Sequence, residues 1–287
     1  MATFVECSYC HNRFPLGSER CPHCAQPGLF PNVQAAGSAE ERNALNLRYQ
    51  TAINGATSQG ADEAIKDFEA AVTGSQAVIA RSLNDLLRMA TSDKEIYATY
   101  HQVVDAGLRL PSDEKGDILR VQTDDALFSG YKQHIRFAAL SLDRIGLRNY
   151  GEFSLVLREN MIAHRASVFE ENSVVWMRKH RIKISEANNL PKGYRAIWSD
   201  RGKLAVAKLS KKIQSTTQPH SYPGLLLQQG ATSEDDQFIE VHIWGPMTRR
   251  TFERVIVKQP QRQVDIIKLN ALREMLGDAG VTIEEKS

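Results

Sequence analysis

The spacing of apolar residues changes near the middle of the chain. From Ala39 to about Asp143 these residues recur at helical spacing, which predicts amphipathic helices. One such set is Ile79, Leu83, Leu86, Leu87 and Ala90, and a second is Ile96, Tyr100, Val103 and Val104. Ser92 and Glu95 match a capping box at the start of the second set. Glycines and the turn at 110–112 divide the region into about four or five helices.

Beyond Gly146 apolar residues recur at every second position, as they do in a strand. Phe153, Leu155 and Leu157 alternate with their neighbours, and the short runs 255–257 and 281–283 have the composition of strands. Helical segments are expected at Asn172–His180, Leu204–Ile213 and Val264–Gly277. The pattern therefore predicts an α+β protein, with a central helical domain followed by a mixed α/β domain.

The most informative strand candidate is the segment 235–246. Because side chains alternate between the two faces of a strand, one face is a plain core face of Ile239, Val241 and Ile243. The opposite face carries Phe238, Glu240, His242 and Trp244. A carboxylate and an imidazole would then lie about 7 Å apart between two aromatic rings. Such a group suits a ligand site, although the outer face of a solvated edge strand has the same pattern.

A second cluster of polar side chains lies in the run Met161–Ser173. It brings hydrogen-bonding residues, among them Arg165 and Ser167, close to the expected start of a helix. Backbone N–H groups at a helix start can hold a phosphate. A simple N-cap at Asn172 or Ser173 explains the same residues.

Charge is distributed unevenly, although the net charge is only +2. Residues 40–125 contain 15 acidic and 9 basic side chains, whereas residues 178–212 contain 11 basic and 2 acidic ones. The two regions face different partners or each other. Trp176, Tyr194 and Trp198 accompany the basic stretch, which suits a phosphate-bearing ligand or single-stranded nucleic acid. A solvated helix face with a basic loop is the alternative.

All four cysteines lie in two CxxC pairs near the N-terminus, Cys7 with Cys10 and Cys21 with Cys24. Four thiolates at this spacing converge on one zinc ion, whose binding supplies the folding energy that so short a segment lacks. His11 and His23 are adjacent to the ligands and are not needed. Arg13 and Arg20 of this zinc ribbon are offset by Glu6 and Glu19, and this lack of net positive charge favours docking on a protein over binding of nucleic acid.

Length and composition describe an ordinary soluble protein. The 287 residues suit about two domains, and 42% hydrophobic with 24% charged residues is typical of globular chains. The sequence has neither a membrane-length apolar run nor a signal-peptide pattern, so we expect a cytoplasmic protein without membrane contact. The expected division is a zinc ribbon at 1–26, a linker at 27–38, a helical domain at 39–134 and a mixed α/β domain at 135–287.

Three segments of the C-terminal half resemble those of bacterial toxin-like proteins that share features with ADP-ribosyltransferases. They are Tyr150-Gly151 with the strand that follows, residues 165–173, and residues 238–246. The likeness covers roughly residues 135–257. It implies an ADP-ribosyltransferase fold, cleavage of NAD at the nicotinamide–ribose bond, and transfer of ADP-ribose to a macromolecular target in the setting of a toxin or of bacterial defence.

Carried over by position, the resemblance makes Glu240 the catalytic glutamate, while His242 would orient the acceptor or act as a base. NAD-binding roles fall to Arg136, Tyr150, Arg165, Ser167, Phe238 and Trp244, with His134 and Arg148 as alternatives to Arg136. The chain lacks the Ser-Thr-Ser triplet of arginine-specific transferases, and Phe238 stands where they carry a second glutamate.

The resemblance also assigns roles to the other parts of the chain. The zinc ribbon and the helical domain would select the target or hold the enzyme in check. A nucleic-acid or protein target would bind through the 178–212 stretch and the ribbon, and an inhibitory partner is a further expectation. Two other hypotheses stay open: a nucleic-acid-binding regulator or nuclease subunit, and a non-catalytic interaction scaffold.

Overall fold

Eight strands form one mixed sheet through the centre of the protein. The computed structural model describes residues 4–7, 10–15, 18, 20–25, 28, 30–94, 97–99, 101–102, 115–182, 190–258, 260 and 262–286. The strands of the sheet are β3 (Gln76–Arg81), β4 (Ile135–Ser141), β5 (Phe153–Leu157), β6 (Ala166–Phe169), β7 (Arg195–Ile197), β8 (Glu240–Trp244), β9 (Phe252–Lys258) and β10 (Thr282–Lys286). Their order is β10-β9-β5-β3-β4-β8-β6-β7, and all neighbours are antiparallel except β9 and β10.

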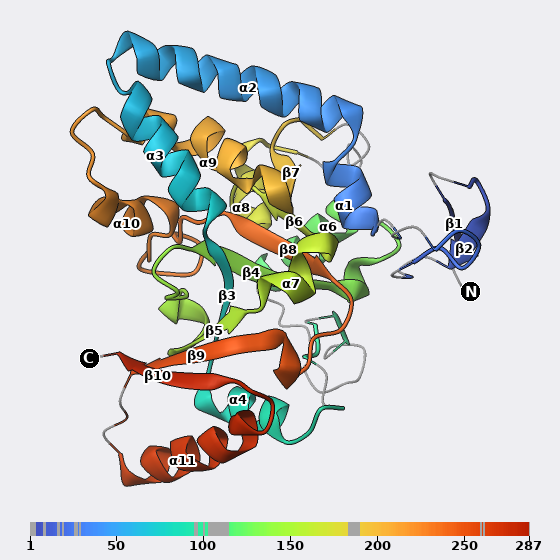
Figure 1. The fold of residues 1–287 in the computed structure, drawn as a ribbon, viewed down its shortest axis with the longest axis vertical. Helices are drawn as coiled ribbons and strands as arrows, with labels where there is room; N and C mark the ends of the chain where they lie inside the picture. Colours follow the sequence, from blue (N-terminus) through green and yellow to red (C-terminus); the bar gives the residue numbers. More distant parts are fainter. Residues whose placement is uncertain are drawn as a thin grey trace.

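Helices cover both faces of this sheet (Figure 1). The larger core contains apolar side chains from α2 (Ala39–Ser58), α3 (Asp62–Thr73), α4 (Leu83–Ala90), α9 (Arg201–Leu209), α10 (Tyr222–Leu226) and α11 (Gln263–Gly277). On the opposite face, α6 (Lys115–Leu127) and α8 (Ser173–Lys179) form a smaller aromatic core with β4, β6 and β8. The protein is therefore α+β, as the sequence predicts.

The predicted alternation of β8 is confirmed. Val241 and Ile243 lie in the larger core, whereas Trp244 lies in the smaller one. The strand candidates at 153–157, 255–257 and 281–283 fall within or overlap β5, β9 and β10, and the three predicted helices of this half correspond to α8, α9 and α11. These elements were predictable because each has a periodic apolar face.

Two parts of the region 39–143, which was expected to be helical, are strands. The helix predicted from Ile79 is preceded by β3, which contains Ile79 and pairs with β4 and β5 in the middle of the sheet, and residues 135–141 form β4 itself. Ile79 lies in the larger core and Val78 in a separate cluster on the other face, so β3 is apolar on both faces and shows no alternation. The helix begins only at Leu83, as α4, and the second predicted set of Ile96, Tyr100, Val103 and Val104 lies outside the described residues.

Part of the predicted linker is a packed helix, α1 (Pro31–Ala36). Its Asn32 is only 3% exposed, and the preceding Phe30 belongs to the smaller core. The chain that leaves the cysteine module is thus anchored on the sheet at β6 and β8. None of the helices in the described part of the chain is long and apolar enough to span a membrane.

Candidate functional site

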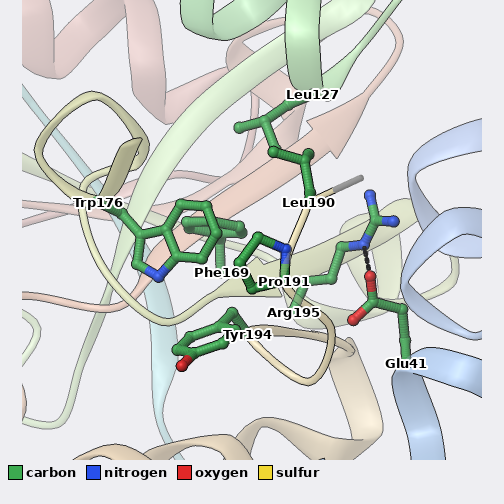
Figure 2. Close-up of a pocket in the computed structure, with 8 residues that line it drawn as sticks. All are labelled: Glu41, Leu127, Phe169, Trp176, Leu190, Pro191, Tyr194 and Arg195. Carbon is green, nitrogen blue, oxygen red and sulfur yellow. Dashed lines mark hydrogen bonds and ion pairs between the residues drawn. The ribbon is translucent and has the colours of Figure 1, made fainter. Parts of the chain in front are cut away.

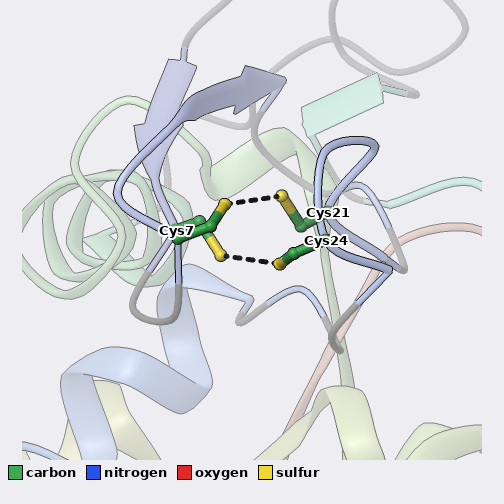
Figure 3. A group of neighbouring side chains, drawn as sticks. Cys7, Cys21 and Cys24 are labelled. Atoms are coloured by element: carbon green, nitrogen blue, oxygen red, sulfur yellow. Dashed lines mark hydrogen bonds between the residues drawn. The ribbon is translucent and has the colours of Figure 1, made fainter.

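The four cysteines come together in the N-terminal module. Strands β1 (Phe4–Glu6) and β2 (Arg13–Pro15) form an antiparallel hairpin beside them. All four Sγ atoms lie within 4.8 Å of one another, and Cys7–Cys24 and Cys10–Cys21 are each 3.6 Å apart (Figure 3). Tetrahedral zinc with bonds of about 2.3 Å sets sulfur atoms about 3.8 Å apart. The donor set therefore fits a metal ion such as zinc.

The two CxxC turns repeat one backbone geometry. In each turn the residue after the second cysteine has a positive φ, 56° at His11 and 57° at Ala25. Its N–H donates to the carbonyl oxygen of the first cysteine at 2.9 Å. A hydrogen bond from the backbone of Asn12 is the main cause that lowers the pKa of Cys10 to about 6, which favours the thiolate that a metal requires.

On the sheet, Glu240 begins β8 and points to the face covered by α6 and α8. The residue is 3% exposed. Its Oε2 accepts hydrogen bonds from His242 Nε2 at 2.9 Å and from the backbone N–H of Ser173 at 3.1 Å. Its Oε1 lies 3.4 Å from Nη1 of Arg120. The protein's own groups thus contact both carboxylate oxygens.

The start of α8 explains why this carboxylate lies here. Asn172 Oδ1 accepts from the N–H groups of Val174 and Val175, which is the N-cap that the sequence allowed. The remaining N–H, that of Ser173, binds Glu240. The helix start that could have held a phosphate therefore holds an internal carboxylate.

Glu240 is ionised despite its burial. Burial by itself raises the pKa of this carboxyl group, but the charge of Arg120 and the hydrogen bond from His242 outweigh it and lower the pKa to about 2. A buried charge with three donors is either a costly structural ion pair or a functional group.

Arg120 of α6 is the residue at this site that sequence reasoning missed. Its guanidinium lies 3.8 Å above the ring of Phe137, and its Nε is 3.2 Å from Asp124 Oδ1. Asp124 in turn lies 2.8 Å from His101 Nε2. An arginine four residues before an aspartate reads as an ordinary surface pair on a helix, so the sequence carried no signal that this pair is buried.

His242 is enclosed by aromatic rings. The ring centroids of Phe128, Phe137 and Phe169 lie 4.8, 5.4 and 5.8 Å from that of His242. The imidazole is 3% exposed, and its Nε2 contacts Glu240. The structure thus places this histidine beside the carboxylate, with its ring fixed by packing.

Tyr150 is 41% exposed, whereas Glu240 and His242 are each 3% exposed. Its hydroxyl lies 3.5 Å from Asn172 Nδ2. Burial of the hydroxyl and the negative charge of Glu240 raise the pKa of Tyr150 to about 12. The three segments singled out in the sequence, at Tyr150, at Asn172-Ser173 and at Glu240, therefore meet in space.

Arg165 and Ser167 take part in hydrogen bonds that hold the segments next to this group. Arg165 Nη1 donates to the carbonyl oxygens of Trp244 and Pro246 at 2.5 and 2.9 Å, which fixes the turn after β8. Ser167 on β6 pairs with His242, and its Oγ accepts from Asn32 Nδ2 at 3.3 Å. Their contacts support the strand that carries Glu240.

Arg136 lies on the other face of the sheet from Glu240. It pairs with Ile243 in the register of β4 and β8, and it donates to the carbonyl oxygens of Tyr97 and His134. Of the two alternatives, His134 packs its ring 4.9 Å from that of Trp244, and Arg148 lies in a short 3-10 turn.

Phe238 and Trp244 are packed in separate clusters and do not flank an open hollow. Phe238 is 4% exposed and contacts Leu147, and Trp244 is 6% exposed among the rings of Phe30, Tyr131 and His134. Two hollows in the described part of the chain have other linings. One, of about 440 Å³, lies between α2 and the turn after α9, and the other lies beside Trp176 (Figure 2).

The basic stretch is paired largely within the molecule. Trp176 and Trp198 are 1% and 5% exposed, so neither offers a free face for stacking. In the described part of the stretch the ion pairs include Arg178–Glu234, Lys179–Glu171, Lys192–Glu40, Lys192–Glu41, Arg195–Glu41, Arg201–Glu159 and Lys203–Asp200. At Glu41, drawn in Figure 2, the acidic and basic regions of the sequence face each other.

No model of a known protein family matches the chain, and no curated protein matches it either.

Proposed function

We propose that the chain is an NAD-dependent ADP-ribosyltransferase-like protein of the bacterial toxin type, with Glu240 as its catalytic carboxylate. One observation supports this proposal. The three segments on which the resemblance rests are far apart in sequence and form one contiguous group, through the 3.5 Å contact of Tyr150 with Asn172 and the 3.1 Å bond from Ser173 to Glu240. Packing alone does not require polar groups from three segments to converge.

The chemistry asked of Glu240 agrees with its environment. When the bond between ribose C1′ and the nicotinamide nitrogen breaks, its electron pair leaves with nicotinamide and the ribose gains oxocarbenium character. A fixed carboxylate beside the ribose stabilises this charge, most strongly where water is excluded. Glu240, with a pKa of about 2, is ionised at neutral pH. The acceptor then forms a bond to C1′ and loses its proton.

His242 fits an orienting role in this scheme. Its Nε2 contacts Glu240, so the imidazole fixes the direction of the carboxylate. Base catalysis on an acceptor would require that nitrogen to leave Glu240. We therefore assign His242 to the positioning of Glu240.

The decisive measurement is nicotinamide release from labelled NAD by the purified chain, alone and with lysate or nucleic acid. Glu240→Gln should lower the rate by at least about 100-fold, as loss of one transition-state charge contact does elsewhere. Glu41→Gln is the matched control, because Glu41 is also buried, with an arginine at 2.7 Å and a backbone N–H at 2.7 Å. Equal rates in the unmodified chain and Glu240→Gln would remove the proposal.

We also propose that the N-terminal module holds one structural zinc ion and that the protein works in the reducing cytoplasm, where four thiols stay free to bind metal. Metal analysis should give one zinc per chain, and Cys10→Ser should lose it. Because the module is so short, chelation should unfold it and leave the cores of the sheet intact. Retention of a folded module after full metal removal would contradict this assignment.

Nucleic-acid binding through the basic stretch has less support. The two tryptophans that would stack on bases are buried, and most of the described cations have carboxylate partners. A gel shift at low salt tests this second function directly. Salt-dependent binding that weakens in Arg178→Ala or Lys179→Ala would favour it over the enzymatic proposal.

A further inference from the structure

The guanidinium of Arg120 fills the space beside the Glu240 carboxylate. The face of Phe137 lies 3.8 Å below it, Asp124 Oδ1 is 3.2 Å from its Nε, and Glu240 Oε1 is 3.4 Å from its Nη1. We call this position, bounded by Phe137, Asp124 and Glu240, the cation subsite. An aromatic face together with two carboxylates is the environment that binds a flat, delocalised cation.

We propose that Arg120 is an internal placeholder in the cation subsite, and that a planar cationic ring of the ligand displaces it. This inference rests on the proposed function, in which the positively charged nicotinamide ring must approach Glu240. Pyridinium and guanidinium groups share the relevant properties, since each is flat, carries a spread positive charge and stacks on aromatic rings. The described arrangement would then be the closed form of the site.

The helix itself provides a position for the displaced side chain. Asp124 lies four residues after Arg120, one turn along α6, and its pairing with Arg120 is an i,i+4 contact. The guanidinium can therefore leave Glu240 and keep Asp124 as its partner. His101, 2.8 Å from Asp124, fixes that carboxylate.

The alternative is that Arg120 only neutralises buried charge. In both cases its removal takes the guanidinium away from Glu240 and Asp124, which are 3% and 0% exposed. The two ideas differ in what the emptied space accepts. A placeholder leaves a space that takes other flat cations, whereas a merely structural pair leaves a space that collapses.

The first experiment is chemical rescue, and it needs no enzymatic activity. Arg120→Ala is titrated with low concentrations of guanidinium, and urea serves as the neutral ligand of the same shape. We expect guanidinium, and not urea, to raise the melting temperature by about 2–4 °C when it fills the space. Arg136→Ala is the matched control, because Arg136 is also buried but donates to uncharged acceptors. Equal shifts in both variants, or none in Arg120→Ala, would overturn the proposal.

The second experiment uses 1-methylnicotinamide, a pyridinium ion without ribose or phosphate. It should bind Arg120→Ala at least about tenfold more tightly than it binds the unmodified chain, and guanidinium should compete with it. Arg120→Gln, which keeps most of the side-chain volume, replaces the alanine variant if that one does not fold. Binding to the unmodified chain and to both variants with equal affinity would dismiss the placeholder.

NAD turnover separates this inference from the function on which it rests. If the unmodified chain releases nicotinamide and Arg120→Gln does so with a several-fold lower KM, both proposals stand. If Arg120→Gln instead loses kcat, Arg120 acts in catalysis and the placeholder is wrong, although the function survives. If no variant turns over NAD while guanidinium and 1-methylnicotinamide still bind Arg120→Ala, the subsite stands and the assigned reaction falls.

Discussion

The two faces of the sheet bury different kinds of side chain at the same strands. Along β4, β6 and β8 one face presents Ala138, Val168 and Val241, all in the larger core. The other face presents Phe137, Phe169 and the pair Glu240–His242. Hydrophobic burial accounts for the first face. The second face carries ionised groups whose desolvation opposes folding, so its composition points to a role other than stability.

We call the second face, with its ionised groups at Glu240 and Arg120, the ionic face. The largest expected effect tests whether these groups contribute to stability as a coupled pair. Glu240→Leu should cost about 3–5 kcal/mol of unfolding free energy because it leaves Arg120 buried without that partner. Adding Arg120→Met should recover part of this loss, since no buried guanidinium then faces the leucine, while Asp124 loses its ion pair and limits the recovery. Urea unfolding of the two single variants and the double variant measures the coupling.

Two variants in the larger core serve as the comparison for these single and double variants. Leu155→Ala and Ile243→Ala remove fully buried side chains from strands β5 and β8, which are separated by β3 and β4. Each should cost about 2–5 kcal/mol, and the two costs should add. Strong coupling here, or none between Glu240 and Arg120, would remove the distinction between the faces.

The same contrast explains what was predictable from sequence. The helices α8 and α11 have apolar residues at helical spacing, and β5 has Phe153, Leu155 and Leu157 at every second position, so their places in the chain follow from these patterns. The strand β3 is apolar on both faces, so its period gave no information. At the candidate site, Glu240 and His242 were identified by alternation along one strand. Arg120 was missed because burial by a neighbouring element is a tertiary property that helical spacing does not report.

A smaller effect concerns acid. The pKa of Glu240 is lowered in the folded protein from an ordinary value of 4.5 to about 2. The carboxylate therefore contributes stability that is fully present above about pH 4.5 and is lost as the pH falls towards 2, with a total of about 3 kcal/mol. The unfolding free energy of the unmodified chain should decline as the pH falls from about 4.5 towards 2, and that of Glu240→Gln should decline less steeply. Leu155→Ala should lower the whole curve without changing its slope.

Asn32 links the N-terminal segment to the ionic face. Its Nδ2 donates to the carbonyl oxygens of Arg165 and His242 at 3.1 and 2.9 Å and to Ser167 Oγ at 3.3 Å. Asn32→Ala should cost about 1–2 kcal/mol by leaving these buried acceptors without a donor. Thermal melts measure this cost. Thr51→Ala on the exposed face of α2 is the control, and a similar cost there would show that the buried hydrogen bonds of Asn32 contribute no more than an exposed one.

The smallest effect on stability is expected at Tyr150. A change at this residue should separate the contribution of the ionic face to stability from its contribution to NAD turnover. Tyr150 is 41% exposed, and its hydroxyl lies 3.5 Å from Asn172. Tyr150→Phe removes only this hydroxyl, so the unfolding free energy should change by less than about 0.5 kcal/mol. Under the proposed function the same change should reduce NAD turnover several-fold, because the hydroxyl lies within the electrostatic reach of Glu240. The control is Tyr49→Phe. The hydroxyl of Tyr49 donates to Glu69 at 2.7 Å and is not part of this site, so its loss should leave turnover unchanged. A stability loss at Tyr150 without loss of turnover would show that this residue, too, belongs to the packing of the face.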